Sequence, residues 1–435
     1  MNKNFYKLLS LILVIGLPGI VFTGCGNQSN GEDGGNDDSV TLTIWDFYGT
    51  TTPIQPLIPK FEEENPNIKI DFQAQPWENY WEKLAAGASG GTLPDLATTG
   101  LMWAPQYVDY GVYADLTPLS NGKINGEDIE SVYSKGMLDA AEKEGRLYGI
   151  PYDFDAYALY YRKDLLEDAG VENPPKNWNE LVSEGKKLTK DTNGDGKTDQ
   201  YAYVVQADWP KWEPFLYGNG GSILNEDNTE AVFNSPEGVE ALQFYSDLVN
   251  KYGIAIYWSA DQGNYISGMK DGTIAMAMDG PYVMGSLKES APELDGSWGV
   301  AHPIENNQFG THIGGTYLSI FENSEHKEEA WQFIEFLSRE DNQIELYKTS
   351  GAAPAYLPAI QNEEINEPDP YFGNEKPLPV FKEVVEQGRP NPIVPEWQQI
   401  ADILNNALEK AILEEATPKD ALDEAAQKVN ELLAE

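Results

Sequence analysis

The chain contains little cysteine, little histidine and few basic residues. One cysteine in 435 residues excludes an internal disulfide, a zinc site built from cysteines and a CxxC redox pair. The 3 histidines show no ligand spacing such as HExxH. The 29 basic residues are outnumbered by 71 acidic ones, and the net charge of −42 opposes approach to nucleic acids and anionic lipid surfaces. We therefore expect no nucleic-acid partner.

The chain does contain abundant core material. Its length suffices for two or three packed cores at the usual ~100–200 residues per domain. Hydrophobic residues make up 41% and aromatic residues 11%, far more than an acidic disordered chain carries. The sequence therefore predicts a globular protein of several domains whose acidity lies on its surface.

The N-terminal segment has the features of an export signal. Two lysines precede an apolar stretch over residues 8–22, which is shorter than the ~20 residues of a membrane-spanning helix. The small residues Thr23 and Gly24 stand directly before Cys25. This segment resembles the lipobox of bacterial lipoproteins, in which the cysteine becomes the lipidated first residue of the mature protein.

The resemblance implies that residues 1–24 are a signal peptide and that Cys25 is the site of lipid attachment. An ordinary cleaved signal with an incidental cysteine is the alternative. Residues 25–39 offer almost nothing apolar to bury and are rich in glycine, asparagine and aspartate. We expect them to form a flexible tether.

Beyond the tether, strand patterns alternate with helix patterns, which predicts an α/β fold with parallel sheets covered by helices on both faces. Two helices have strong start signals, because a serine or threonine precedes a proline and an acidic residue. The expected strands are 40–46, 68–72, 201–206, 273–278, 298–301 and 316–321, and the expected helices include 54–64, 78–88, 178–190 and those beginning at 236 and 418.

Motifs of known enzymes are present only in fragments. Residues 87–91 fit GxSxG but follow a helix pattern, whereas a nucleophile elbow follows a strand. Residues 183–186 fit SxxK within a polar helix and lack the accompanying motifs. Residues 196–198 end like a phosphate-binding loop, but Asp191 stands where the required glycine should be. We therefore expect no catalytic activity.

One loop has the oxygen spacing of a calcium site. Oxygen-bearing side chains occupy positions 1, 3, 5 and 9 around a glycine at position 6, which resembles an EF-hand or dockerin loop. Position 12 is Ala202 rather than the bidentate glutamate, so the loop either binds a structural calcium ion with help from elsewhere or is only an Asx-rich turn. The candidate metal residues are Asp191, Asn193, Asp195, Lys197 and Asp199.

Several short motifs together resemble the family 1 extracellular solute-binding proteins, the group that includes maltose-binding protein. Their order and spacing match the family over nearly the whole mature chain. The motifs lie at 41–45, 61–66, 93–96, 114–118, 147–151, 159–164, 178–181, 276–281 and 417–422.

This resemblance implies a two-lobed fold of the periplasmic-binding-protein type, with a ligand cleft between lobes that are hinged by several chain crossings. We expect the crossings near 152–156, near 278–281 and near 345–355. The first lobe would comprise residues 40–152 plus 279–345, and the second lobe 153–278 plus 346–435.

The resemblance also implies where the ligand binds. Aromatic faces stack on sugar C–H groups, while carboxylates and amides bind hydroxyls. For each tryptophan, burial in the core is the alternative. The candidate substrate-binding residues are Trp45, Asp46, Trp77, Trp103, Asp155, Asp208, Trp209, Trp212, Asp279, Tyr282, Gly314, Gly315 and Trp397.

The resemblance implies a monomeric, lipid-anchored protein on the outer face of a bacterial cell membrane. It would capture a neutral sugar or oligosaccharide and deliver it to the permease subunits of an ABC importer. A cationic ligand, such as a polyamine or peptide, and a secreted carbohydrate-active enzyme are the alternatives.

Overall fold

The computed structural model describes residues 39–48, 52–259, 262–388 and 391–434; for Trp77, Glu78 and Asn79 it describes the backbone only. The predicted signal peptide, Cys25 and almost all of the tether lie outside the described residues. Within these ranges, no helix combines the length and apolar character needed to cross a membrane.

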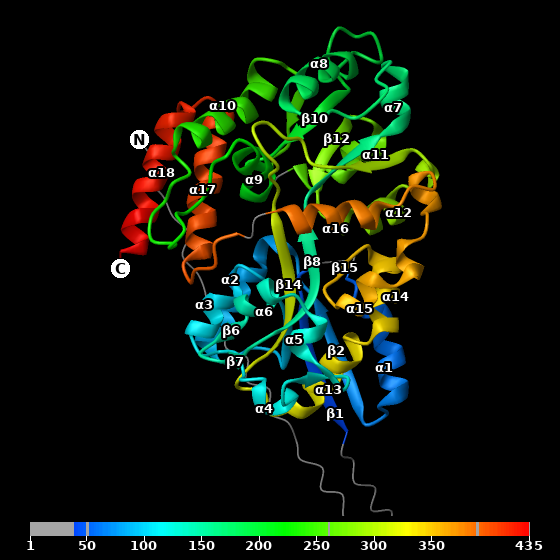
Figure 1. Cartoon of the computed structure of the whole chain (residues 1–435), viewed down its shortest axis with the longest axis vertical. Helices are drawn as coiled ribbons and strands as arrows, with labels where there is room; N and C mark the ends of the chain where they lie inside the picture. Colours follow the sequence, from blue (N-terminus) through cyan, green and yellow to red (C-terminus); the bar gives the residue numbers. More distant parts are fainter. Residues whose placement is uncertain (1–38, 49–51, 260–261, 389–390, 435) are drawn as a thin grey trace, which may run out of the picture. The chain divides into compact units, whose positions relative to one another are not determined.

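Two sheets organise the fold (Figure 1). The first has six strands in the order β15-β8-β14-β3-β1-β2, and the second has five in the order β11-β10-β12-β9-β13. The first contains β1 (Val40–Asp46), β2 (Ile68–Ala74), β3 (Leu96–Gly100), β8 (Ile150–Ala156), β14 (Ile313–Ile320) and β15 (Ala353–Pro354). The second contains β9 (Ala158–Arg162), β10 (Tyr201–Val205), β11 (Ala255–Tyr257), β12 (Ile274–Asp279) and β13 (Trp298–Ala301). Two small hairpins are β4 (Lys123–Ile124) with β5 (Glu127–Asp128) and β6 (Glu142–Lys143) with β7 (Arg146–Leu147).

Helices cover both sheets. In the first half of the described chain they are α1 (Ile58–Glu64), α2 (Trp77–Gly90), α3 (Ala104–Asp109), α4 (Thr117–Ser120), α5 (Ile129–Val132), α6 (Lys135–Ala140), α7 (Lys163–Asp168), α8 (Trp178–Leu188) and α9 (Trp209–Gly218). In the second half they are α10 (Pro236–Asn250), α11 (Ile266–Asp271), α12 (Val283–Ser290), α13 (Lys327–Leu337), α14 (Glu340–Ser350), α15 (Leu357–Gln361), α16 (Pro377–Gln387), α17 (Trp397–Ile412) and α18 (Pro418–Leu433).

The local predictions agree well with these elements. Ser235 caps α10 by accepting a hydrogen bond from the Gly238 amide, and Thr417 caps α18 by accepting one from the Asp420 amide. The GxSxG fragment lies at the end of α2, where Gly91 adopts a left-handed conformation with φ of 69°. It is therefore a helix exit and not a nucleophile elbow.

The prediction of parallel sheets is only half right. Strand β1 is parallel to β2 and β3, and β10 is parallel to β11 and β12. The other pairings are antiparallel, including β14 with β3 and β8 and β9 with β12 and β13. Figure 1 shows β8 and β14 side by side. Strand direction depends on the pairing partner, which the local alternation pattern does not specify.

The described chain changes sheet at two places. The first change falls at Tyr157, between β8 and β9, directly after the segment predicted for it. The second falls between Ala301 and Ile313. The predicted position at 278–281 is therefore wrong, because the chain stays in the second sheet after β12 and forms β13 there. The third expected crossing, near 345–355, is not a change of sheet, because β15 still pairs with β8 and only helices follow it in the described chain. A strand ending in Asp-Gly-Pro looks like a crossing in sequence, but only pairing decides which sheet the next strand joins.

Candidate functional site

Polar and aromatic side chains gather where the chain passes between the two sheets. The passing segments bond to each other, since Thr311 Oγ1 donates to the Tyr157 carbonyl at 2.6 Å and the Tyr157 amide donates to the His312 carbonyl at 3.1 Å. We call the side chains around this passage the crossing site. It comprises Asp155, Tyr157, Lys211, Asp279, Tyr282 and His312.

Asp279 is the best-bonded acid of the crossing site. It is 1% exposed, and it accepts hydrogen bonds from the hydroxyls of Tyr265 and Tyr282 and from the Gly280 amide. The ammonium group of Lys211 lies 2.5 Å from Asp279 Oδ2 and 4.5 Å from the centre of the Tyr157 ring. The buried charge of Asp279 is thus compensated within the protein.

Asp155 differs, because part of its hydrogen-bonding capacity is unused. Its Oδ1 atom is buried and has no hydrogen-bond partner among the described residues. Burial raises the pKa of Asp155 to about 6, while the charges of His312 and Lys211 act in the opposite direction. Gly280 leaves the space for this carboxylate, since a Cβ added there would lie 1.8 Å from Oδ1. Asp155 therefore has an acceptor left for a ligand.

Asp153, two residues earlier on β8, has the same property. It is 2% exposed, accepts a hydrogen bond from the Tyr48 hydroxyl at Oδ2, and keeps a buried Oδ1 without a partner in the described residues. Burial raises its pKa to about 7. Sequence reasoning missed Asp153, although its alternation with Asp155 on one strand was visible.

The side chains of the two candidates at the end of β1, Trp45 and Asp46, already interact with other side chains of the protein. Asp46 is fully buried and accepts hydrogen bonds from Thr52 and, at 2.9 Å, from Thr98. Burial raises its pKa to about 6. Trp45 donates from Nε1 to Gln73 at 3.1 Å, and the Lys83 ammonium lies 3.8 Å from its ring centre.

A run of tryptophans joins elements from both lobes. Trp103 stacks on Trp81 with ring centres 4.2 Å apart, and its Nε1 donates to Gln398 of α17 at 2.6 Å. On its other side Trp209 lies 6.4 Å away, and Trp209 meets Trp397 edge-on at 4.9 Å. Trp103, Trp209 and Trp397, predicted separately, are thus neighbours.

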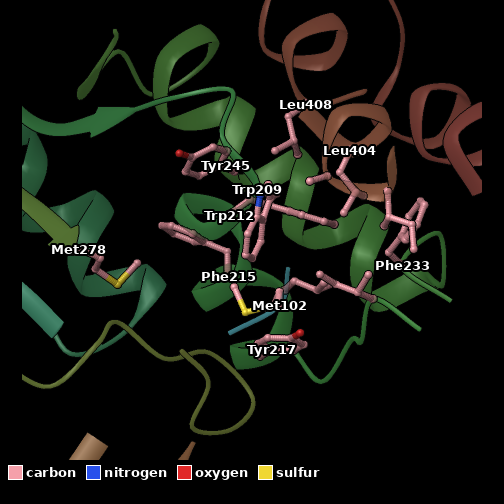
Figure 2. Packing of buried hydrophobic residues seen from close by; sticks show 14 of the residues in the cluster. Met102, Trp209, Trp212, Phe215, Tyr217, Phe233, Tyr245, Met278, Leu404 and Leu408 are labelled. Atoms are coloured by element: carbon pink, nitrogen blue, oxygen red, sulfur yellow. The ribbon is translucent and has the colours of Figure 1, made fainter. Parts of the chain in front are cut away.

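The segment holding Asp208, Trp209 and Trp212 is a helix start and not a loop. Pro210 stands in the first turn of α9, where its missing amide costs nothing. Figure 2 shows Trp212 and Phe215 of α9 in the same buried cluster as Leu404 and Leu408 of α17, and Trp212 is fully buried. Trp212 belongs to the core in this structure, whereas Asp208 precedes the helix and is partly exposed; burial raises its pKa.

The two glycines lie on β14, beside the crossing site. A Cβ added to Gly314 would lie 2.8 Å from His312 Nε2, and one added to Gly315 would lie 2.7 Å from the Asp153 carbonyl oxygen. Both positions therefore need the close approach that glycine permits. Trp77 is the first residue of α2, and its side chain is outside the described part. The ligand contacts of all these residues stay predictions.

Sequence reasoning overlooked Lys211, Glu213 and His312. Glu213 is fully buried on α9, and its Oε2 lies 2.6 Å from His312 Nδ1. The signal that was available is the run from Asp208 to Glu213, in which charged residues alternate with tryptophans in a helix start.

The loop proposed for calcium is closed by its own hydrogen bonds. Asp191 accepts from the amides of Gly194 and Gly196, and Asp199 accepts from Thr192 and Asn193. Throughout the described ranges no group of three or more His, Cys, Asp or Glu residues is placed to hold a metal ion. This arrangement fits an Asx-rich turn, and calcium binding stays a prediction.

The two sheets and the chain passages between them define a fold with two lobes. A family model described as bacterial extracellular solute-binding protein matches residues 48–344, and the chain belongs to that family. It is a binding protein and not an enzyme.

Individual relatives agree over most of the chain. A Brucella abortus protein, named for binding without a stated ligand, is 31% identical over 408 residues, covering 91% of this chain and 93% of its own. An ABC substrate-binding protein from Listeria monocytogenes, solved with cycloalternan, is 28% identical with a TM-score of 0.80 and covers 91% of this chain and 99% of its own. A Thermotoga lettingae solute-binding protein, solved with α-D-tagatose, is 28% identical with a TM-score of 0.81 and covers 91% of this chain and 100% of its own.

Proposed function

We propose that this protein is the substrate-binding component of a bacterial ABC importer and that it captures a neutral sugar or oligosaccharide. The observation that carries the proposal is the crossing site at the junction of the two lobes, where Asp155 keeps an acceptor without a partner among the described residues and Trp209 lies 5.3 Å from the His312 ring. Two solved relatives are complexes with carbohydrates, which supports this ligand class.

The proposed ligand contacts come from both lobes. Asp155 and Trp103 belong to the segments of the first sheet, while Asp208, Trp209 and Tyr282 belong to the second. A ligand that touches both sets binds the closed arrangement more tightly than an open one and so shifts the population toward closure. The permease subunits would then recognise the closed form.

The proposal includes a lipid anchor at Cys25 and removal of residues 1–24. A single acyl chain gives only reversible membrane binding, so a stable anchor needs more than one chain or a second membrane contact. The net charge of −42 argues against a second contact made by basic residues.

A cationic ligand is the second candidate. The carboxyl groups of Asp155 and Asp208 lie near the passage between the sheets with pKa values raised by burial, and Lys211 is already paired with Asp279. A polyamine would compensate such acids directly.

Thermal unfolding with a ligand panel decides between the two candidates. The panel contains D-tagatose, maltotriose, cycloalternan, spermidine and putrescine. A ligand at 100 times its Kd stabilises the folded state by about 2.7 kcal/mol. We expect stabilisation by a sugar, and stabilisation by the polyamines alone would replace the sugar proposal with the cationic one.

The site itself is tested by paired tryptophan variants. Trp209→Ala should weaken sugar binding by at least about 30-fold, since removing a central aromatic contact typically costs ~2 kcal/mol or more. Trp258→Ala is the control, because Trp258 is partly exposed after β11, its Nε1 donates to the Gly263 carbonyl, and it is not among the residues proposed to bind the sugar. Equal affinities of the two variants would place the sugar elsewhere.

A further inference from the structure

His312 is a buried, well-held side chain that the sequence motifs gave no role. It is 4% exposed and lies directly before β14, at the second passage between the sheets. The Tyr157 ring centre lies 4.6 Å from the imidazole on one side, and Trp209 approaches at 5.3 Å. Two aromatic rings thus fix the position of the imidazole.

A buried carboxylate fixes the orientation of the same ring. His312 Nδ1 lies 2.6 Å from Glu213 Oε2, and Asn391 Nδ2 lies 3.1 Å from that oxygen and 3.2 Å from Nδ1. Because Glu213 Oε2 is the nearest polar atom to Nδ1 and already accepts from Asn391, we assign Glu213 as the acceptor and the Nδ1 proton as a second donor to it. Asn391 is held in turn, since it accepts from Tyr217 at 2.9 Å and donates to the Ile313 carbonyl at 3.1 Å.

This arrangement leaves Nε2 as the ring atom available to a ligand. No other described residue hydrogen-bonds to it. Nε2 faces Gly314, whose added Cβ would lie 2.8 Å from Nε2 and 3.7 Å from the Cβ of Asp155. His312 and Asp155 therefore flank one glycine, and Asp155 contributes a buried oxygen that has no partner in the described chain.

We propose that His312 binds the ligand through Nε2 beside Asp155, so that the two side chains hold neighbouring hydroxyl groups of a sugar. Glu213 and Asn391 act as positioning residues, because they set the ring orientation without touching the ligand. This inference rests on the proposed sugar-binding function and adds a specificity-determining residue to it.

The chemistry of Nε2 selects hydroxyl groups over ammonium groups. A neutral imidazole accepts at Nε2 and a charged one donates, whereas a hydroxyl can do either. A hydroxyl therefore satisfies His312 in both protonation states. An ammonium group satisfies only the neutral ring and is repelled by the charged one.

Nitrogen-15 NMR of the histidine rings tests the contact in the wild-type protein. The chain has only 3 histidines, so His302→Gln and His326→Gln assign the His312 signals by elimination. We expect D-tagatose, maltotriose or cycloalternan, whichever binds, to shift the His312 Nε2 signal and to leave the other two rings unchanged. A bound sugar that leaves the His312 signal in place overturns the inference and leaves the sugar function intact.

Calorimetry of variants measures how much the His312 contact contributes to the affinity for the sugar. His312→Gln should weaken binding of that sugar by at least about 10-fold, while His302→Gln, at a partly exposed ring, should change nothing. Glu213→Gln should weaken binding less and should alter the ring tautomer seen in the nitrogen-15 spectrum. Wild-type affinity in folded His312→Gln overturns the inference. Binding of no sugar in the panel refutes the proposed function and this inference with it.

Discussion

Replacing Asp153 by asparagine should stabilise the protein at alkaline pH. The side chain is 2% exposed, and one of its oxygens has no hydrogen-bond partner among the described residues. Burial raises its pKa from 3.8 to about 7. Asparagine has nearly the same shape and retains a carbonyl oxygen to accept the hydrogen bond from Tyr48.

The sign of the stability change with pH follows from how many protons Asp153 binds in the folded and in the unfolded state. Between pH 3.8 and about pH 7 the folded protein keeps a proton on Asp153 that the unfolded chain has lost. Stability therefore falls as the pH rises through this window, and the loss is complete above about pH 7. A pKa difference of about 3 corresponds to about 4 kcal/mol, and about 3 kcal/mol of it falls between pH 5 and pH 8.5.

Urea unfolding followed by tryptophan fluorescence at pH 5 and pH 8.5 measures this effect. The unfolding free energy of Asp153→Asn, minus that of the wild type, should increase by about 3 kcal/mol between the two pH values. Taking this difference cancels contributions from the acids that do not interact with Asp153. Asp128→Asn is the matched control, since its side chain is 73% exposed. The reasoning fails if the unfolding free energies of Asp153→Asn and of the wild type change by the same amount between pH 5 and pH 8.5.

Three further predictions concern the anchor, the loop and closure. Cys25→Ser should abolish lipid attachment and move the protein from the membrane fraction to the soluble one; unchanged fractionation and processing would contradict the lipobox interpretation. EDTA should lower the melting temperature if the 191–199 loop binds calcium, with little effect on sugar affinity, and an unchanged melting curve would reduce the loop to an Asx-rich turn. A bound sugar should change tryptophan fluorescence and reduce the radius of gyration in X-ray scattering, because the lobes close around it; a sugar that binds without either change would exclude closure as the response.

The local elements were largely predictable because their signals lie within a few residues. The strand 40–46 matches β1, and 298–301 matches β13. The serine and threonine caps of α10 and α18 form the predicted hydrogen bonds. Such features depend on neighbouring residues, which the sequence shows directly.

Some residues of the crossing site were chosen from the sequence, but their contacts with one another were not. Asp155, Trp209 and Asp279 were chosen from the sequence, yet the roles of Lys211 and His312 were not visible. Lys211 matters only because folding brings it to Asp279, which is 68 residues away along the chain, and His312 matters because Glu213 orients it. Contacts over such separations leave no local pattern.

The sequence by itself determined the family, the acidic surface, the capped helices and the positions of most strands, because periodicity, capping and motif order are local properties of the chain. Only the tertiary structure decided which strands share a sheet, where the chain crosses between sheets, and which tryptophans are core. Trp209 and Trp212 stand three residues apart on one helix and are both buried, yet Trp212 is completely enclosed by the core while Trp209 also meets the ring of His312. That difference arises from the direction in which each side chain leaves α9 and from what the rest of the fold packs against it.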